Sequence, residues 1–574
     1  MQWKSKLNQW IEQLPKEDSL RLELLRNLHD EKLMEDSFYK ELAFGTGGMR
    51  GIIGPGTNRM NIYTVRKVAA GLSHYIVEQG KDAKDRGVVI AYDSRHMSPK
   101  FALEVAKTVG SQGIKVYLFD ELHPTPVLSF AVRYLHALAG IVITASHNPP
   151  EYNGLKIYAE DGAQLPPDAA DIIVQQMNKI DCELTIEVSS EDKLIEEGFL
   201  TTIGEQIDHA YNDALGTILL SQKNQDKELS IVYTALHGTG NKPVRIAFSS
   251  YGFTNVTIVK EQENSDPDFS TVQFPNPEEH AAFELAIQYG KKVDADVLLA
   301  TDPDADRLGV AVKNESGDYV VLTGNQTGAL MLHYLLEQKQ NKGNLPANGV
   351  VMKTIVTSEL GRKIASNFGM KTIDTLTGFK FIAEKINEFE QTNEYSFLFG
   401  YEESYGYLIG DFVRDKDAVQ SAVFVAEVAA HYKSQGKTLY EGLMDLFERF
   451  GYHQESTRSV TLTGKDGAQQ IERILASFRN HPPTDVNGVA VAVIEDYAAS
   501  ETLEVVTGLK TAIELPKSNV LKYKLTDGSW FCIRPSGTEP KCKVYFSVTG
   551  ESMESSSEKL VALENAVMGS LQKK

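Results

Sequence analysis

Short apolar segments alternate with amphipathic stretches along most of the chain. In the N-terminal part, strand-like apolar runs at 88–92, 114–119 and 139–144 are interleaved with helical patterns at 63–79 and 99–110. Short strands separated by helices of about twelve residues are typical of βαβ units and predict a largely parallel sheet. The residues before about position 42 predict one or two leader helices ahead of a glycine-rich turn at 44–51.

The same alternation returns twice before the pattern changes. The second cycle has strand patterns at 229–233, 256–259 and 297–300 and helical ones at 243–251 and 278–289; the third has a helix at 327–338 and strands at 350–352 and 397–399. The last hundred residues predict a helix at 469–478, short strands and a terminal helix. We therefore predict three similar α/β domains with mixed, mainly parallel sheets and a smaller C-terminal α+β domain, bounded at 1–205, 206–323, 324–452 and 453–574.

Composition excludes several classes of protein. The chain has 574 residues, a formal charge of −20 and only three cysteines, Cys182, Cys532 and Cys542, in no metal-binding spacing. This favours a cytoplasmic protein without a disulfide framework. The polar N-terminus is unlike a signal peptide, and no apolar run reaches the ~18 residues of a membrane span, so we expect no membrane partner. The acidic balance argues against nucleic acid as a partner.

The segment Thr144-Ala145-Ser146-His147-Asn148-Pro149 is the first candidate for chemistry. It follows the apolar run 139–144, and ligands of open α/β sheets bind at the carboxyl ends of strands. A serine placed there could be a nucleophile or a phosphoryl carrier. The alternative is a polar turn in which Ser146 and Asn148 bond to their own backbone. The G-x-S-x-G elbow of α/β-hydrolases is absent.

The segment Asp302-Pro303-Asp304-Ala305-Asp306-Arg307 follows the strand pattern 297–300. In an extended chain, alternate residues face one side, so three carboxylates would converge and repel unless a cation lay among them. Oxygen ligands suit Mg²⁺, whereas a calcium EF-loop fails because Arg307 and Lys313 stand where Gly and Glu are required. The alternative is a solvated acidic turn.

Two further loops carry polar groups after strands. Arg534-Pro535-Ser536-Gly537-Thr538 combines a guanidinium, hydroxyls and a flexible glycine, which suits a phosphate-binding nest or else an ordinary polar hairpin. Glu402-Glu403-Ser404 alternates carboxylate and hydroxyl groups that could bond to sugar hydroxyls, or simply end a strand.

Taken together, these segments resemble the α-D-phosphohexomutase superfamily. The shared motifs occur in the same order along nearly the whole chain: F-G-T-G-G-M-R-G, T-A-S-H-N-P, D-P-D-A-D-R, E-E-S-Y-G and R-P-S-G-T-E-P-K. The chain length, Thr377-Gly378-Phe379-Lys380 and Arg414-Asp415-Lys416-Asp417 look most like the phosphoglucomutase branch, which includes a long phosphoglucomutase/phosphopentomutase type.

The resemblance implies four domains around a central cleft and a role for each motif. It implies that Ser146 carries a phosphoryl group and binds one Mg²⁺ together with Asp302, Asp304 and Asp306. It places Arg50, His147, Lys156 and Lys416 at the transferring phosphoryl group, where Arg307 offsets charge. It assigns Thr377, Gly378, Glu402 and Ser404 to the sugar, and Arg534, Ser536, Gly537 and Thr538 to the distal phosphate.

One position departs from part of the superfamily. Some members carry His two residues after the sugar-binding serine, where this chain has Gly406. A general base at that position is therefore excluded, and Lys416 becomes the candidate if neighbouring cations depress its pKa.

The implied activity is the interconversion of glucose 1-phosphate and glucose 6-phosphate. A phosphoserine would exchange its phosphoryl group through glucose 1,6-bisphosphate, which would also serve as activator. The nearest alternatives are a phosphopentomutase or phosphomannomutase with the same mechanism. More distant ones are a metal-dependent phosphatase and a non-catalytic sugar-phosphate binding protein. The expected partners are small sugar phosphates, and the expected state is a monomer or weak dimer.

Overall fold

The computed structural model describes residues 2–45, 47–221, 228–461, 464–535 and 541–572. The chain forms two compact units, the first from residues 1–327 and 382–439, the second from residues 328–381 and 440–574. Three helices contain the points at which the chain passes from one unit to the other: α13 (Gly324–Asn341), α15 (Phe379–Thr392) and α17 (Leu439–Phe450).

The first unit begins with three short helices, α1 (Gln2–Gln13), α2 (Ser19–Asn27) and α3 (Glu31–Phe38). Asp18 and Asp30 cap α2 and α3 by accepting hydrogen bonds from backbone N–H groups of the first turn. Trp10 is fully buried, and its ring meets the edges of Phe38 and Tyr63 at centroid distances of 5.6 and 5.7 Å. These helices therefore have an apolar core of their own beside α4 (Ile62–Glu78).

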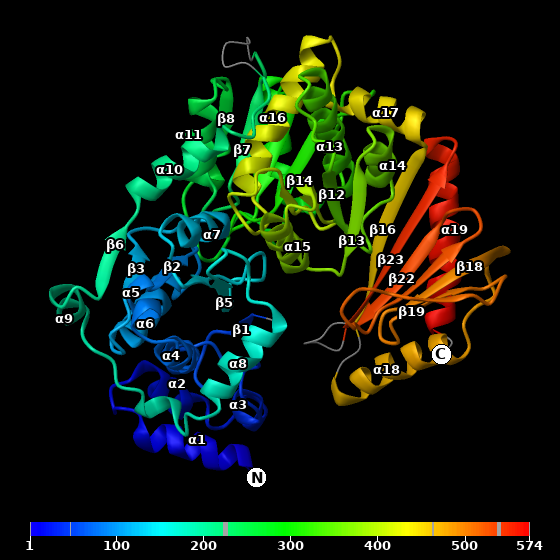
Figure 1. Ribbon diagram of the computed structural model, residues 1–574. Helices are drawn as coiled ribbons and strands as arrows, with labels where there is room; N and C mark the ends of the chain where they lie inside the picture. The colour runs from blue at the N-terminus through cyan, green and yellow to red at the C-terminus, as the bar shows by residue number, and fades with distance from the viewer. Residues whose placement is uncertain (1, 46, 222–227, 462–463, 536–540, 573–574) are drawn as a thin grey trace. The chain divides into compact units, whose positions relative to one another are not determined.

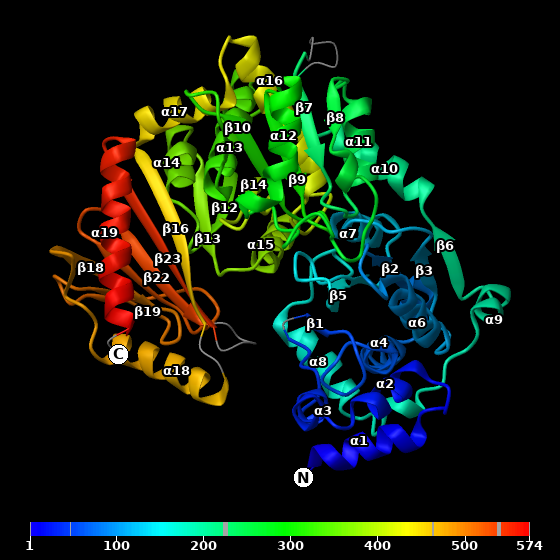
Figure 2. The same ribbon diagram turned by 180° about the vertical axis from the view of Figure 1, so that it is seen from behind.

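A six-stranded sheet follows, in the order β1-β5-β4-β2-β3-β6. Strands β4, β2, β3 and β6 pair in parallel, whereas β5 pairs antiparallel with both β4 and β1. Helix α7 (Thr125–Tyr134) lies on one side of the sheet and α4 and α6 (Ser98–Gly110) on the other (Figures 1 and 2). The strand bounds are β1 Gly48–Ile52, β2 Val88–Tyr92, β3 Val116–Phe119, β4 Ala139–Ile143, β5 Tyr152–Ala159 and β6 Leu200–Ile203; α5 (Lys81–Arg86), α8 (Pro167–Met177) and α9 (Glu191–Glu196) complete this part.

A second, five-stranded sheet in the first unit has the order β11-β10-β9-β7-β8. Its strands β9, β7 and β8 are parallel, and β10 and β11 form antiparallel pairs at one edge. Helix α16 (Ala418–Ser434) packs on β9 and on α11 (Asn241–Ser250). The other bounds are β7 Ile231–Thr234, β8 Val256–Ile258, β9 Val297–Thr301, β10 Leu308–Lys313, β11 Tyr319–Val321, β14 Ser396–Tyr401, β15 Tyr407–Leu408, α10 Glu205–Leu215 and α12 Glu284–Val293.

The second unit combines a parallel pair of strands with an antiparallel sheet. Strands β12 (Gly349–Thr354) and β13 (Lys371–Thr375) are parallel and contact α14 (Leu360–Asn367) through β13. The C-terminal sheet has the order β16-β23-β22-β21-β18-β19-β20, with every pair antiparallel. Helix α19 (Met553–Gln572) packs on β23 and β16. The remaining bounds are β16 Tyr452–Thr461, β17 Asp485–Val486, β18 Val489–Asp496, β19 Glu501–Glu504, β20 Lys510–Ala512, β21 Leu521–Leu525, β22 Trp530–Pro535, β23 Lys541–Gly550 and α18 Gly464–Asn480.

The observed elements confirm the predicted α/β class with its mixed sheets. The run 88–92 is β2 without a shift, and the run 139–144 is β4 apart from its last residue. The predicted helix at 278–289 is wrong at its start. Asn276 accepts a hydrogen bond from the N–H of Glu278, a 3₁₀ turn follows at His280–Phe283, and α12 begins only at Glu284.

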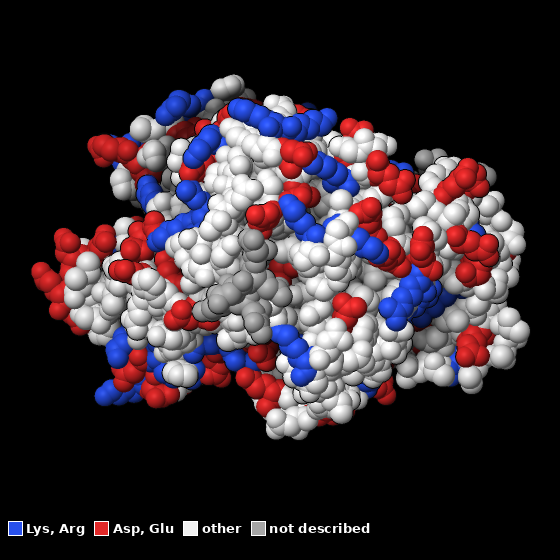
Figure 3. All heavy atoms as spheres, turned by 90° about the horizontal axis from the view of Figure 1, so that it is seen from above, with Lys and Arg blue, Asp and Glu red and all other residues white. Residues whose placement is uncertain are grey.

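Within the described ranges, no helix is both long enough and apolar enough to cross a membrane. On the face drawn in Figure 3, acidic and basic side chains are interspersed.

Candidate active site

Ser146 is the third residue after the end of β4 and has an unusual backbone conformation. Its φ of 51° lies in the left-handed region, which residues other than glycine seldom adopt and which is common at functional sites. Its N–H donates to Thr144 Oγ1 at 2.8 Å, and its Oγ donates to Asp302 Oδ2 at 2.9 Å. His147 Nδ1 lies 3.1 Å from the same Oγ. The serine side chain is therefore held between a histidine and a carboxylate.

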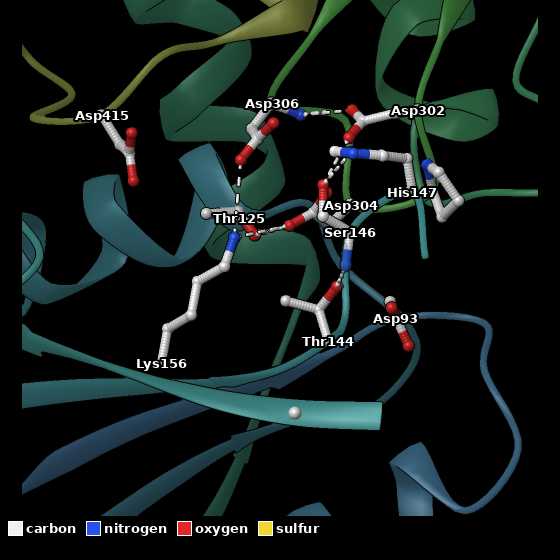
Figure 4. A network of polar contacts seen from close by, with 12 residues as sticks. Asp93, Thr125, Thr144, Ser146, His147, Lys156, Asp302, Asp304, Asp306 and Asp415 are labelled. Atoms are coloured by element: carbon white, nitrogen blue, oxygen red, sulfur yellow. Dashed lines mark hydrogen bonds and ion pairs between the residues drawn. The ribbon is translucent and has the colours of Figure 1, made fainter. Parts of the chain in front are cut away.

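The three aspartates converge in the turn that follows β9, as Figure 4 shows. Asp302, Asp304 and Asp306 are buried, and one ligand atom from each lies within 4.8 Å of the others. The predicted convergence is confirmed, but the reason given for it is wrong. The segment is a turn and not extended chain, and Ala305 reverses it with a φ of 51°.

Two lysines and a threonine contact the aspartates. Lys156 of β5 donates to Asp304 Oδ2 at 2.9 Å and lies 3.5 Å from Asp306 Oδ2, and Lys416 donates to Asp306 Oδ2 at 2.7 Å. Thr125, the first residue of α7, donates its N–H to the Asp304 carbonyl at 2.9 Å and its hydroxyl to Asp304 Oδ2 at 3.0 Å. The cluster thus joins both sheets of the first unit.

Two carboxylate oxygens of the acidic cluster accept no hydrogen bond from the described residues. Asp304 Oδ1 and Asp306 Oδ1 are buried and have no hydrogen-bond partner among the described residues. Burial, together with Asp306 and Asp304, raises the pKa of Asp302 well above its usual value. Burial also acts to raise the pKa of Asp304, but Lys156 more than offsets it and the pKa is lowered. Crowded carboxylates with unpartnered buried oxygens fit a small divalent cation with oxygen ligands, and Mg²⁺ is such a cation.

The loop that carries Glu402 and Ser404 is tied to the aspartate turn through the backbone. The N–H of Leu308 donates to the Tyr405 carbonyl at 3.0 Å, and the N–H of Ala418 donates to the Ala305 carbonyl at 3.1 Å. Glu402 is buried, and Ser404 is half-buried. Arg307 pairs with Glu278 and lies 3.7 Å from Asp306 Oδ1 through its Nε.

Lys416 occupies the space next to Gly406. A Cβ at position 406 would lie 2.4 Å from Lys416 Cδ, so this lysine requires the glycine. The expected depression of the Lys416 pKa by cations is not observed. Burial acts to lower the pKa, but Asp306, Asp415 and Glu402 raise it above its ordinary value. In this arrangement Lys416 is a charged partner of the carboxylates.

Arg50 comes from β1 and reaches residues 144–151, the loop between β4 and β5 that is called the serine loop below. Its Nη1 donates to Asn148 Oδ1 at 2.8 Å, and its side chain is otherwise exposed. Across the strand pair, Arg50 faces Gly154, where a Cβ would lie 2.6 Å from the Thr144 carbonyl and 2.8 Å from that of Met49. This glycine allows β1, β5 and the end of β4 to approach closely.

The remaining expected residues belong to the second unit. Thr377 and Gly378 are half-buried and follow β13, and Gly378 has a φ of 116°. Arg534 lies on β22 and donates from Nη1 to the Tyr545 hydroxyl at 3.0 Å. Ser536, Gly537 and Thr538 lie outside the described residues.

Several residues in direct contact with the site were not predicted. Arg95 bonds to the serine loop, Thr125 bonds to Asp304, and Asp415 accepts from Tyr158 Oη at 2.7 Å and from the N–H of Lys416 at 2.8 Å. A sequence signal existed for Arg95. It follows the run 88–92 as Ser146 follows the run 139–144, and the carboxyl ends of parallel strands share an edge.

Comparisons with known proteins agree with this arrangement. Four family models match in order: phosphoglucomutase/phosphomannomutase alpha/beta/alpha domains I, II and III at residues 41–183, 209–317 and 323–450, and the C-terminal domain at 463–559. A phosphoglucomutase of Staphylococcus haemolyticus is 40% identical over 521 residues, which cover 91% of this chain and 92% of the relative. One of Staphylococcus aureus is 38% identical over 530 residues, covering 92% and 93%.

Solved structures show the same fold. A phosphoglucomutase/phosphomannomutase family protein from Burkholderia thailandensis aligns with a TM-score of 0.66 at 19% identity, covering 92% of this chain and 97% of the other. Parafusin, a phosphoglucomutase from Paramecium in an open form, aligns with a TM-score of 0.64 at 17% identity, covering 93% and 96%.

Proposed function

The chain belongs to the phosphoglucomutase/phosphomannomutase family and is a phosphoryl-transferring mutase, and we propose that it interconverts glucose 1-phosphate and glucose 6-phosphate. The observation that supports this most directly is the contact of 2.9 Å between Ser146 Oγ and the buried aspartate cluster. A hydroxyl at that place can carry a phosphoryl group beside a cation site.

In the proposed reaction, phosphorylated Ser146 donates its phosphoryl group to the free hydroxyl of a sugar monophosphate. The bond between phosphorus and Oγ breaks while a bond to the sugar oxygen forms, and the hydroxyl proton passes to a base. Lys416, the candidate named from the sequence, is charged beside Asp306 and can take this proton only after it has lost its own. The product of this step is glucose 1,6-bisphosphate. The bisphosphate then turns over and returns its other phosphoryl group to Ser146, so that it also acts as activator.

The chain's own residues position the reactants. Arg50, His147, Lys156 and Arg307 neutralise the transferring phosphoryl group, and Glu402 and Ser404, with Thr377 and Gly378, hold the sugar hydroxyls. Arg534, Ser536, Gly537 and Thr538 hold the distal phosphate. One Mg²⁺ per chain, held by Ser146, Asp302, Asp304 and Asp306, would offset negative charge on the phosphoryl oxygens.

We further propose the domain division 1–205, 206–323, 324–452 and 453–574. A cytoplasmic location is supported by the three free cysteines. A monomer or weak dimer remains the expected state.

The test is a panel of glucose, mannose and pentose phosphates assayed for isomerised product and for free phosphate. We expect the highest kcat/KM with the glucose phosphates and no accumulation of free phosphate. A pentose or mannose preference would identify one of the other mutases, and free phosphate as main product would identify a metal-dependent phosphatase. Binding without turnover would identify a sugar-phosphate binding protein.

Ser146→Ala tests the carrier itself. Intact mass should show one phosphoryl group on the wild type and none on the variant, and mutase activity should fall by at least about 10³-fold. The matched control is Ser434→Ala, at an exposed helix end far from this chemistry in sequence. Substantial activity of Ser146→Ala would place the carrier elsewhere.

A further inference from the structure

Arg95 is a buried guanidinium that binds the backbone of the serine loop. Its Nη1 donates to the carbonyls of Pro149 at 2.8 Å and Tyr152 at 3.1 Å, and its Nη2 donates to the carbonyls of Ser146 and Asn148. The side chain has no exposed surface. One cation therefore fixes four carbonyl groups between Ser146 and Tyr152.

Arg95 is itself held on two sides. Asp93, also without exposed surface, accepts from the Arg95 N–H at 3.0 Å and from Ser98 Oγ at 2.7 Å, and its Oδ2 lies 3.4 Å from Arg95 Nε. Figure 4 shows Asp93 beside Thr144, at the start of the serine loop. Phe269 lies in the segment between β8 and β9, and the centroid of its ring is 4.9 Å from the Arg95 guanidinium carbon. The guanidinium is thus fixed before any substrate binds.

This arrangement supports the unusual backbone of Ser146. A left-handed serine is retained only where its surroundings over-determine it. Arg95 binds the carbonyl of Ser146, and Thr144 Oγ1 accepts from the N–H of Ser146. These two bonds fix the orientation of the Ser146 Cα–Cβ bond, which directs Oγ toward Asp302. In addition, the four carbonyl oxygens bound to Arg95 point toward its guanidinium and therefore do not repel a phosphoryl dianion on Ser146 Oγ.

We infer that Arg95 is a positioning residue for phosphoryl transfer, acting through the carbonyls of the serine loop and not through contact with the sugar. The inference rests on the proposed role of Ser146. Arginine is required because its planar fork directs several donors at once, whereas a lysine ammonium is a single point charge.

The experiment compares Arg95→Lys and Arg95→Met with Arg59→Lys. Arg59 is a matched control, since it is also buried, pairs with Asp36 and donates to the carbonyls of Asp36 and Asn58. The readouts are kcat and KM for glucose 1-phosphate at saturating bisphosphate, and the single-turnover rate at which Ser146 of dephosphorylated enzyme takes label from glucose 1,6-bisphosphate.

For Arg95→Lys we expect kcat and the labelling rate to fall on the order of 10²-fold, because a small misplacement of a reacting group has effects of this size. KM should change by less than about threefold, and Arg95→Met should be slower still. Arg59→Lys should match the wild type in both rates. A purely structural role would lower the melting temperature without this split, so wild-type labelling by folded Arg95→Lys overturns the inference.

A second variant decides the matter if both Arg95 variants fail to fold. Phe269→Leu leaves every hydrogen bond of Arg95 in place but removes the ring that packs on it, and it should lower the labelling rate several-fold at unchanged KM. An unchanged rate overturns the inference. If the wild type takes no label on Ser146, the proposed function fails, whatever the variants do.

Discussion

Each unit contains one cluster of charged side chains with buried members, and the two clusters differ in their balance of charge. The first consists of Asp302, Asp304 and Asp306 with Lys156 and Lys416. The second consists of Lys353, Lys522, Arg362, Glu359 and Asp374, with Lys353 of β12 in register with Asp374 of β13. Lys353 is as well buried as the aspartates, with a side chain only 1% exposed.

The balance of charge is reversed between the clusters. In the first, the three aspartates face Lys156, Lys416 and Arg307, and Arg307 is shared with a fourth carboxylate, that of Glu278. The Oδ1 atoms of Asp304 and Asp306 have no hydrogen-bond partner among the described residues. In the second, three cations face two carboxylates. Glu359 lies within 4.0 Å of all three cations, and Asp374 within 3.2 Å of two.

The difference shows what buried charge is used for in each place. Cations lower the pKa of both Glu359 and Asp374 in spite of their partial burial, so the carboxylates of the second cluster are compensated without an added cation. Repulsion adds to burial in raising the pKa of Asp302, so the first cluster gains from an added cation. Asp374 Oδ1 of the second cluster also lacks a hydrogen bond, although Lys353 Nζ lies 3.2 Å from it. Burial, polarity and unpaired acceptors alone therefore do not separate a cation site from an ion-pair network, whereas the raised pKa of Asp302 marks repulsion that the second cluster lacks.

The largest expected effect is that of Asp304→Asn on turnover. Removing one carboxylate charge and one ligand oxygen should lower kcat/KM on the order of 10³-fold, since a bound metal contributes several kcal/mol to such transition states. The measurement is mutase rate against Mg²⁺ concentration. In the second cluster, Glu359→Gln should leave the Mg²⁺ concentration at half-maximal rate unchanged. An equal shift in both variants would contradict the distinction.

The next effect is on stability, and it should appear in the second cluster. Lys353→Met removes the fully buried partner of the half-buried Glu359 and Asp374 and should cost about 3–5 kcal/mol of unfolding free energy. Trp530, against which Lys522 packs at 4.1 Å, reports on this unit in urea titrations once Trp3 and Trp10 are replaced by Phe. Lys510→Met removes a half-exposed pair with Glu501 and should cost less than about 1 kcal/mol. Similar losses of unfolding free energy for both lysines would show that the buried network contributes no more to stability than an exposed ion pair.

The sequence predicts the helices and strands well, but it predicts only some of the side-chain contacts between them. The runs of β2 and β4 are apolar throughout, because both faces of a parallel sheet are covered, and such runs are visible without a structure. The three aspartates were found because they lie at every second position of one short segment, although the turn at Ala305 was not foreseen.

The second cluster could not be predicted because its members are spread over four elements. Lys353, Asp374 and Lys522 look like ordinary polar residues of strands, and only the register of β12 with β13 and the approach of β21 bring them together. Arg95 was overlooked for a related reason. Its four acceptors are backbone carbonyls, and the identity of the residues that carry them gives no signal.

A smaller effect should follow from adding Mg²⁺ to the folded protein. A ligand that binds only the native state stabilises it by about 3 kcal/mol at 100 times its dissociation constant. Thermal unfolding with and without excess chelator should therefore show an upward shift with Mg²⁺ in the wild type and in Lys353→Met, but not in Asp304→Asn. A shift that survives in Asp304→Asn would assign the stabilising site to other residues.

The smallest expected effect is a pH dependence confined to the second cluster. Burial, reinforced by Lys353, lowers the pKa of Lys522 from 10.5 to about 8, while Glu359 and Glu495 act against the shift. Between these values the unfolded chain holds a proton that the folded chain has released, so stability rises with pH from about 8 to about 10.5. The shift corresponds to a gain of at most about 3 kcal/mol.

Lys522→Met should abolish this rise, whereas Lys524→Met, on the same strand with a side chain 41% exposed, should retain it. The measurement is the difference in unfolding free energy between pH 7.5 and pH 10 for each protein, and an equal rise in wild type and Lys522→Met would show that the lysine is charged throughout and that its neighbours compensate it fully.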